Sequence, residues 1–123
     1  MHTAVLYLGR ILFGGYFIMS GYNHLANLTM MAGYTQSKGV PAPKPAVALT
    51  GILLLIGGIS TLLNFYPVVG LIALIVFLIP VSFLMHAFWK VQDPMAKMGE
   101  RVNFFKNLAL LGGVLILLAG YVG

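Results

Sequence analysis

The stretch that decides the fold is residues 68–89, VVGLIALIVFLIPVSFLMHAFW, which contains no Asp, Glu, Lys or Arg. A helix of about 20 mostly apolar residues is long enough to cross the hydrocarbon core of a bilayer. Pro80 lies inside the stretch, and a proline in a helix interior predicts a bend. We therefore expect a membrane-spanning helix from Val68 to Trp89.

Three further apolar segments surround this one, at about residues 4–26, 46–63 and 104–122. The connection at 64–67, Asn-Phe-Tyr-Pro, is short enough only for an antiparallel helical hairpin. The period-two alternation of a membrane barrel is absent, so helices must satisfy the backbone in lipid. The sequence predicts an all-α integral membrane four-helix bundle, up-down-up-down, as a single transmembrane domain over residues 1–123.

Composition supports a bilayer environment. Of the 123 residues, 60% are hydrophobic and only 7% are charged, whereas a soluble domain commonly has about a quarter charged. The chain has no cysteine, which excludes disulfides, thiolate metal sites and iron–sulfur clusters. The net charge of +5 comes from dispersed basic residues without interleaved aromatic ones, which argues against nucleic-acid binding.

The basic residues predict an orientation. Those in or beside the first and third connections are Lys38, Lys44, Lys90, Lys97, Arg101 and Lys106. The second connection and the carboxyl terminus have neither Lys nor Arg. By the positive-inside rule the first and third connections face the cytoplasm, so both termini are expected outside.

The two long connections differ in character. The first, 27–45, mixes apolar and polar residues, which predicts a short interfacial helix; a plain loop is the alternative. It ends in Pro41, Pro43 and Pro45, which predict an extended approach to the second span. The third, 90–103, is polar and carries both acidic residues of the chain, so we expect a loop there.

The candidate site lies at the cytoplasmic end. His24 ends the first span, His86 and Trp89 end the third, and Lys106 and Asn107 begin the fourth. We expect His24, His86 and Lys106 to face a common cavity with Trp89 beside it. This set suits a flat ligand with a polar head, such as a quinone. Two histidines without a third strong ligand are a weak metal signal, and a structural belt of interfacial aromatic and basic side chains is the remaining interpretation.

Arg10 is the one basic residue expected inside the membrane, where an ionisable side chain is a site candidate by default. It can serve as an interfacial anchor, pair with Asn64 from the opposite turn, or meet an acceptor on another membrane protein. Small residues are the usual helix contacts in lipid, and we expect those of spans one, two and four to pack within the bundle, with oligomer contacts as the alternative. They are Gly14, Gly15, Gly21, Gly57, Gly58, Ala109, Gly112 and Gly113.

Several motifs carry a family resemblance. They are GRIL at 9–12, SG at 20–21 followed by His24, SKGVPAP at 37–43, GG at 57–58, HAFW at 86–89 with DP at 93–94, and NFFKNLALLGG at 103–113. Together they resemble the DoxX family of small four-span bacterial membrane proteins over nearly the whole chain. The resemblance implies a four-helix bundle in the bacterial inner membrane and a link to sulfur metabolism and oxidative-stress complexes.

Two departures from the family pattern matter for function. Many members carry Lys where this chain has His24, and Glu where it has Leu54. The loss of that carboxylate removes a natural partner for a buried cation. We therefore expect an accessory or structural subunit of a larger membrane redox or respiratory-type complex, not catalytic on its own. The alternative is a quinone-reactive oxidoreductase subunit that uses His24, His86 and Lys106.

Overall fold

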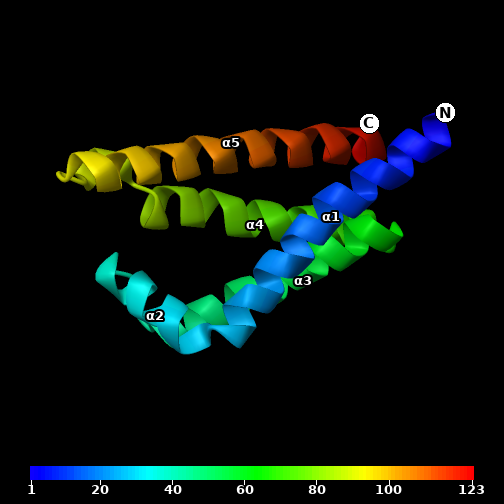
Figure 1. Ribbon diagram of the computed structural model, residues 1–123. Helices are drawn as coiled ribbons and strands as arrows, with labels where there is room; N and C mark the ends of the chain where they lie inside the picture. The colour runs from blue at the N-terminus through cyan, green and yellow to red at the C-terminus, as the bar shows by residue number, and fades with distance from the viewer.

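The computed structural model describes residues 1–123 and is entirely helical apart from short connections (Figure 1). The elements are α1 (His2–Ala26), α2 (Leu28–Ser37), α3 (Pro43–Leu63), α4 (Pro67–Met85), the short 3-10 turn η1 (Phe88–Lys90) and α5 (Pro94–Val122). Four of the helices, α1, α3, α4 and α5, are long and apolar enough to cross a membrane. The predicted all-α membrane bundle is confirmed, and the chain is a multi-pass membrane protein.

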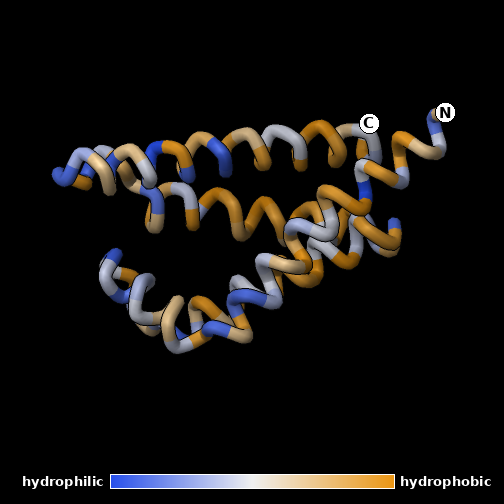
Figure 2. The backbone as a smooth tube through the Cα atoms, viewed as in Figure 1, coloured by the Kyte–Doolittle hydropathy of each residue, from blue (hydrophilic) through white to orange (hydrophobic).

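The long helices pack in chain order, α1 against α3, α3 against α4, and α4 against α5. Successive spans alternate in direction, and Figure 1 shows both chain ends at the same end of the molecule. Figure 2 shows hydrophobic residues along most of α3 and α4 and hydrophilic ones gathered toward the end that holds α2. Extensive packing between α1 and α5 is absent, so the bundle has an open side.

Glycines bring α1 and α3 into close contact. A Cβ on Gly14 would lie 2.8 Å from the carbonyl oxygen of Gly58, and a Cβ on Gly21 would lie 2.8 Å from that of Gly51. Gly14 and Gly21 are seven residues apart on α1, and Gly51 and Gly58 are seven residues apart on α3, so the glycines of each helix fall on one face. The expected packing of small residues inside the bundle is therefore confirmed for Gly14, Gly21 and Gly58. Gly57 likewise packs against α4, because a Cβ there would overlap Leu74.

The apolar core lies between these helices. Phe17 of α1, Leu54 of α3, Leu71 and Leu74 of α4, and Val114 of α5 are each 0–1% exposed. Leu54 belongs to the centre of this core, at the position where the family resemblance implies Glu in many members. The large apolar side chains on the outer faces, such as those on α1 and α5, remain exposed as lipid-facing residues must.

Helix ends differ from the expected segments at three places. The predicted extended segment through Pro45 is wrong, because α3 already begins at Pro43. A proline in the first turn lacks only an N–H that would have no helical partner. The third span ends as an α-helix at Met85, not at Trp89. The expected loop over 90–103 is also wrong, because α5 begins at Pro94.

The early start of α5 has a local cause. The Asp93 side chain accepts a hydrogen bond from the Ala96 backbone N–H at 2.9 Å, and Pro94 occupies the first helical position. Hydropathy marks only the part of a helix that lies in lipid, so it missed this polar extension. Glu100 consequently lies on a helix rather than on a loop.

Packing of the small residues on α5 also departs from expectation. A Cβ on Gly112 or Gly113 would meet no atom within 4 Å, and the same holds for Gly15 on α1. These glycines therefore do not pack within the bundle. The reason is the open side of the molecule, where α1 and α5 lack extensive packing.

Candidate functional site

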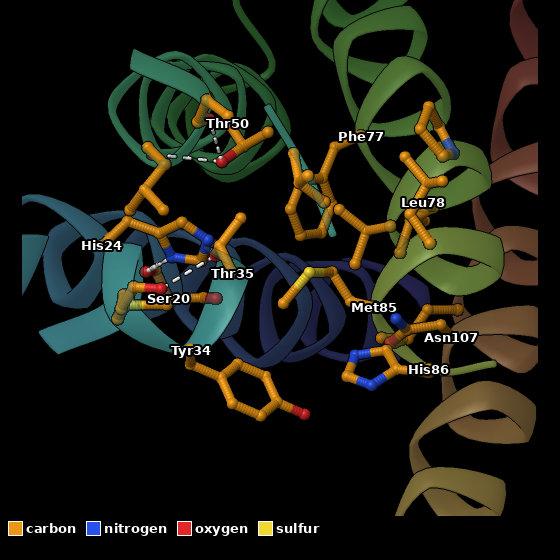
Figure 3. A pocket seen from close by; sticks show the side chains of 18 of the residues that line it. Ser20, His24, Tyr34, Thr35, Thr50, Phe77, Leu78, Met85, His86 and Asn107 are labelled. Carbon is orange, nitrogen blue, oxygen red and sulfur yellow. Dashed lines mark hydrogen bonds between the residues drawn. The ribbon is translucent and has the colours of Figure 1, made fainter. Parts of the chain in front are cut away.

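A cavity of about 280 Å³ opens at the end of the bundle that carries α2. All five α-helices contribute to its walls, and 13 of its 21 lining residues are hydrophobic. Polar groups in the lining come from Ser20, His24, Tyr34, Thr35, Thr50, His86 and Asn107, which Figure 3 labels, and from Tyr16 and Lys106. The predicted candidates His24, His86, Lys106 and Asn107 therefore face one cavity, with polar groups gathered in an apolar chamber.

The two histidines lie on different walls of this cavity (Figure 3). The His24 Nδ1 lies 2.8 Å from the carbonyl oxygen of Ser20, and its ring packs edge-on against Phe77. A carbonyl only accepts hydrogen bonds, so Nδ1 carries the proton and donates it. In the neutral imidazole, Nε2 is then left as an acceptor. No hydrogen bond joins His24 directly to His86.

His86 follows the last turn of α4 and points toward α5. Its Nδ1 lies 3.3 Å from Oε1 of Glu100. Because the carboxylate accepts, the proton again lies on Nδ1, and the neutral ring keeps Nε2 free as an acceptor. In both imidazoles, Nδ1 therefore donates to a protein oxygen and Nε2 is left as an acceptor.

Asn107 is the most deeply enclosed polar group of the cavity. The residue is 6% exposed and lines the cavity (Figure 3), and its amide makes none of the side-chain hydrogen bonds in the structure. No polar atom is sealed off without a partner, so this amide opens into the cavity space. Lys106 lines the cavity beside it, with Nζ 5.9 Å from the centroid of the Tyr16 ring.

Glu100 organises the mouth of the cavity, although no sequence motif singled it out. The residue is 7% exposed. Its Oε2 accepts a hydrogen bond from the Tyr34 hydroxyl at 2.8 Å and lies 2.6 Å from Nζ of Lys38, while Oε1 lies 3.3 Å from the amide nitrogen of Asn103. With His86, four side chains surround one carboxylate, which is the arrangement that makes a buried charge tolerable.

The α5 extension explains this placement. Glu100, Asn103 and Asn107 are spaced three and four residues apart, which puts them on one face of the helix. The same spacing relates Tyr34 to Lys38 at the end of α2. The Asp-Pro pair that begins α5 was the available signal, since it places Glu100 two turns into a helix.

Tyr34 lies in α2, outside the spans. Burial, the hydrogen bond to Glu100 and the negative charge of Glu100 together raise the pKa of Tyr34 to about 12. Its hydroxyl is therefore a donor throughout the ordinary pH range, which keeps one oxygen of Glu100 occupied.

Trp89 lies outside the cavity lining. It is 48% exposed and belongs to an aromatic cluster with Phe83, Phe88 and Phe104, at ring-centroid distances of 6.3, 5.2 and 5.4 Å. The helix end at Met85 accounts for this position, because the chain leaves α4 before Trp89 is reached. The cluster packs η1 against α5.

Arg10 lines a second cavity, of about 450 Å³, near the opposite end of the bundle. Its guanidinium carbon lies 5.8 Å from the centroid of the Tyr7 ring, and it forms no ion pair. Asn64, one of its expected partners, instead accepts a hydrogen bond from the Tyr121 hydroxyl at 2.8 Å. An unpaired Arg costs about 2.5–3.5 kcal/mol at the centre of a membrane helix and less toward its ends.

The chemistry available at the first cavity is binding and proton handling. No group of three or more His, Asp or Glu side chains lies together as metal ligands would. The cavity offers two acceptor nitrogens, a free carboxamide and a lysine ammonium to a ligand with a polar head. Its apolar walls suit a ring or chain.

Comparison with known proteins gives one result. The family model described as DoxX matches residues 5–87, which is more than half of the chain. No curated protein and no solved structure matches. The matched region contains the glycine contact of α1 with α3, His24 and His86, and the four spans agree with the fold expected from the resemblance. The chain belongs to the DoxX family.

Proposed function

We propose that this protein is an accessory subunit that holds or tunes a larger membrane redox complex. The observation that carries the proposal is the open face of α5. A Cβ on Gly112 or on Gly120 would meet no atom within 4 Å, and with Ala109 these two residues fall on one side of the helix.

Such a face favours a protein neighbour. In lipid, helices associate where small residues let their backbones approach closely. Gly14 and Gly21 of α1 and Gly51 and Gly58 of α3 serve that purpose inside the bundle, whereas Gly112 and Gly120 of α5 have no neighbour in the chain. The small size of the protein and the association of the family with redox complexes support a larger assembly as the source of a helix that packs on this face of α5.

Affinity purification in mild detergent tests the proposal. Gly112→Leu projects a large side chain from the open face, and should reduce stoichiometric recovery of larger membrane proteins while leaving the thermal stability of the isolated chain unchanged. Gly99→Leu is the matched control, because Gly99 is an equally open glycine in the polar extension of α5. Equal recovery of the same proteins by both variants and the wild type would contradict the proposal.

We propose with it a location in the bacterial inner membrane with both termini outside. Lys38 and Lys97 belong to the two connections that hold most of the basic residues, which supports a cytoplasmic location for that end. Because the chain lacks cysteine, single cysteines at positions 2 and 97 can be labelled in intact cells. A membrane-impermeant maleimide should react at position 2 only; labelling at 97 alone would invert the topology.

A second candidate function is a quinone-reactive subunit. The observation that favours it is the convergence of His24, His86, Lys106 and the unbonded Asn107 on one cavity with apolar walls. A quinone supplies two-electron redox chemistry when bound. The residues of this chain would orient its ring: Asn107 and Lys106 can donate to carbonyl oxygens, and the imidazoles can accept from hydroxyls.

A binding measurement separates the two candidates. Purified protein in nanodiscs is titrated with a short-chain ubiquinone or menaquinone while Trp89 fluorescence is followed. The quinone candidate requires saturable binding that is weakened by Asn107→Leu and by His86→Ala. Absence of saturable binding, with intact recovery of partner proteins, would leave the accessory role alone.

A further inference from the structure

The second cavity is lined by Arg10, a cation that lies far from both carboxylate side chains of the protein. Asp93 caps α5, and Glu100 pairs with Lys38. Gly113, which lines the cavity with Arg10, is 13 residues beyond Glu100, or about 20 Å along the helix. No carboxylate of the chain pairs with Arg10, so an anionic partner for it has to be a separate molecule.

The cavity has the form of an apolar groove between α1 and α5, with Leu71 of α4 in its lining. Its volume is about 450 Å³, and its lining is mainly apolar, with Phe13, Ile116 and Leu117 among the residues. A Cβ on Gly9 or Gly113 would meet nothing within 4 Å, so neither glycine position is filled by a neighbouring side chain.

The polar groups around the groove leave Arg10 unsatisfied. The Thr61 hydroxyl donates to the carbonyl oxygens of Gly57 and Gly58, and the Tyr121 hydroxyl donates to Asn64. The guanidinium lies over the ring of Tyr7 and forms neither an ion pair nor a side-chain hydrogen bond in the structure. Arg10 thus presents free N–H donors at an apolar groove, and a guanidinium matches phosphate oxygens in a bidentate geometry.

We propose that this groove binds one anionic phospholipid, with its phosphate on Arg10 and an acyl chain along Phe13 and Leu117. A flexible alkyl chain fits between two helices, whereas a helix of a partner protein is about 10–12 Å wide and can only lie across the opening. A net-anionic headgroup is required, because the groove contains no carboxylate to receive the ammonium of a zwitterionic lipid.

Native mass spectrometry from mild detergent tests this binding. Wild-type protein is titrated with dioleoyl phosphatidylglycerol or with dioleoyl phosphatidylcholine, which has the same acyl chains. The wild type should retain one phosphatidylglycerol in clear preference to phosphatidylcholine. Arg10→Gln removes the cation and should weaken retention about tenfold, as expected for the loss of hydrogen bonds to a charged group.

Gly113→Leu gives an independent measurement, because it fills the groove while the Arg10 side chain is unchanged, and it should also lower retention. Lys97→Gln is the matched charge control on an exposed part of α5 and should bind like the wild type. Thermal melting identifies any variant that fails to fold. If only one of Arg10→Gln and Gly113→Leu folds, that variant alone decides the test. Equal retention by the wild type and the folded groove variants would overturn the proposal.

Three further results would also overturn it. Equal retention of phosphatidylcholine would show that the net charge of the lipid is irrelevant. Displacement of the lipid by free glycerol 3-phosphate at equal concentration would identify a site for soluble anions. Loss of a partner protein in Arg10→Gln, with lipid retention unchanged, would assign the cation to a protein carboxylate instead.

Discussion

Nζ of Lys38 lies 2.6 Å from Oε2 of Glu100, and this ion pair ties the end of α2 to α5 across the mouth of the first cavity. The Tyr34 hydroxyl donates to the same oxygen over a separation of 66 residues. Since α2 otherwise packs mainly on α3, these contacts join the two sides of the molecule where the bundle is open. The closure of the cavity therefore depends on one carboxylate.

Neutralising that carboxylate should loosen the cavity mouth. Glu100→Gln keeps the shape of the side chain but removes the charge that Lys38 neutralises, and should destabilise the protein by about 1–3 kcal/mol. Thermal melting in detergent, followed by the fluorescence of Trp89, measures the change. Lys38→Met should give a similar loss, and the double variant should lose less than the sum because the two side chains interact. Additive losses would show that the pair is not coupled.

The Asp93 cap of α5 makes a separate contribution to the stability of the fold. Asp93→Ala removes the acceptor of the Ala96 N–H and should lower stability by about 1 kcal/mol. Asp93→Ser retains a capping oxygen, so it should restore most of the loss. If alanine and serine at position 93 are equally destabilising, the charge of Asp93 rather than its cap is responsible.

Two glycines of similar sequence context should respond in opposite ways to a side chain. A Cβ on Gly58 would lie 2.7 Å from the backbone nitrogen of Ile18, so Gly58→Leu should separate α1 from α3 and prevent folding. Gly112→Leu should fold normally, because that position is open. Size-exclusion chromatography of fluorescent fusions reports the folded yield of each. A folded Gly58→Leu variant would contradict the close contact.

Tyr34 should titrate later than an ordinary tyrosine. Its pKa is raised from 10.0 to about 12, so the folded state holds this proton more tightly than the unfolded state. The resulting stabilisation is present below pH 10 and is lost as the pH rises from about 10 to about 12. The difference in absorbance at about 295 nm between the wild type and Tyr34→Phe isolates this group. In Glu100→Gln the same titration should move to lower pH, and an unmoved titration would exclude Glu100 as a cause.

The sequence was sufficient for the spans because length and hydropathy alone decide which segments cross a bilayer. It placed His24 and His86 at one end, since alternating spans return every second helix end to the same side. Glu100 was expected near the site but on a loop, and it was not chosen as a site residue, because its partners on α2 are distant in sequence and its helix is a polar extension beyond the apolar segment. The two glycine pairs look alike in sequence, yet only tertiary packing decides that Gly58 is enclosed and Gly112 is open.

Asn107 gives the sharpest test of whether the first cavity is built for a ligand. The Asn107 amide opens into a largely apolar cavity and makes no side-chain hydrogen bond, so it costs folding up to about 1–3 kcal/mol, and Leu has a similar size without that cost. Asn107→Leu should therefore raise the melting temperature of the ligand-free protein. Asn103→Leu is the control, because Asn103 already bonds to Glu100 and its loss should lower stability. If Asn107→Leu is destabilising, the amide has a structural partner in the folded protein, and its retention needs no ligand.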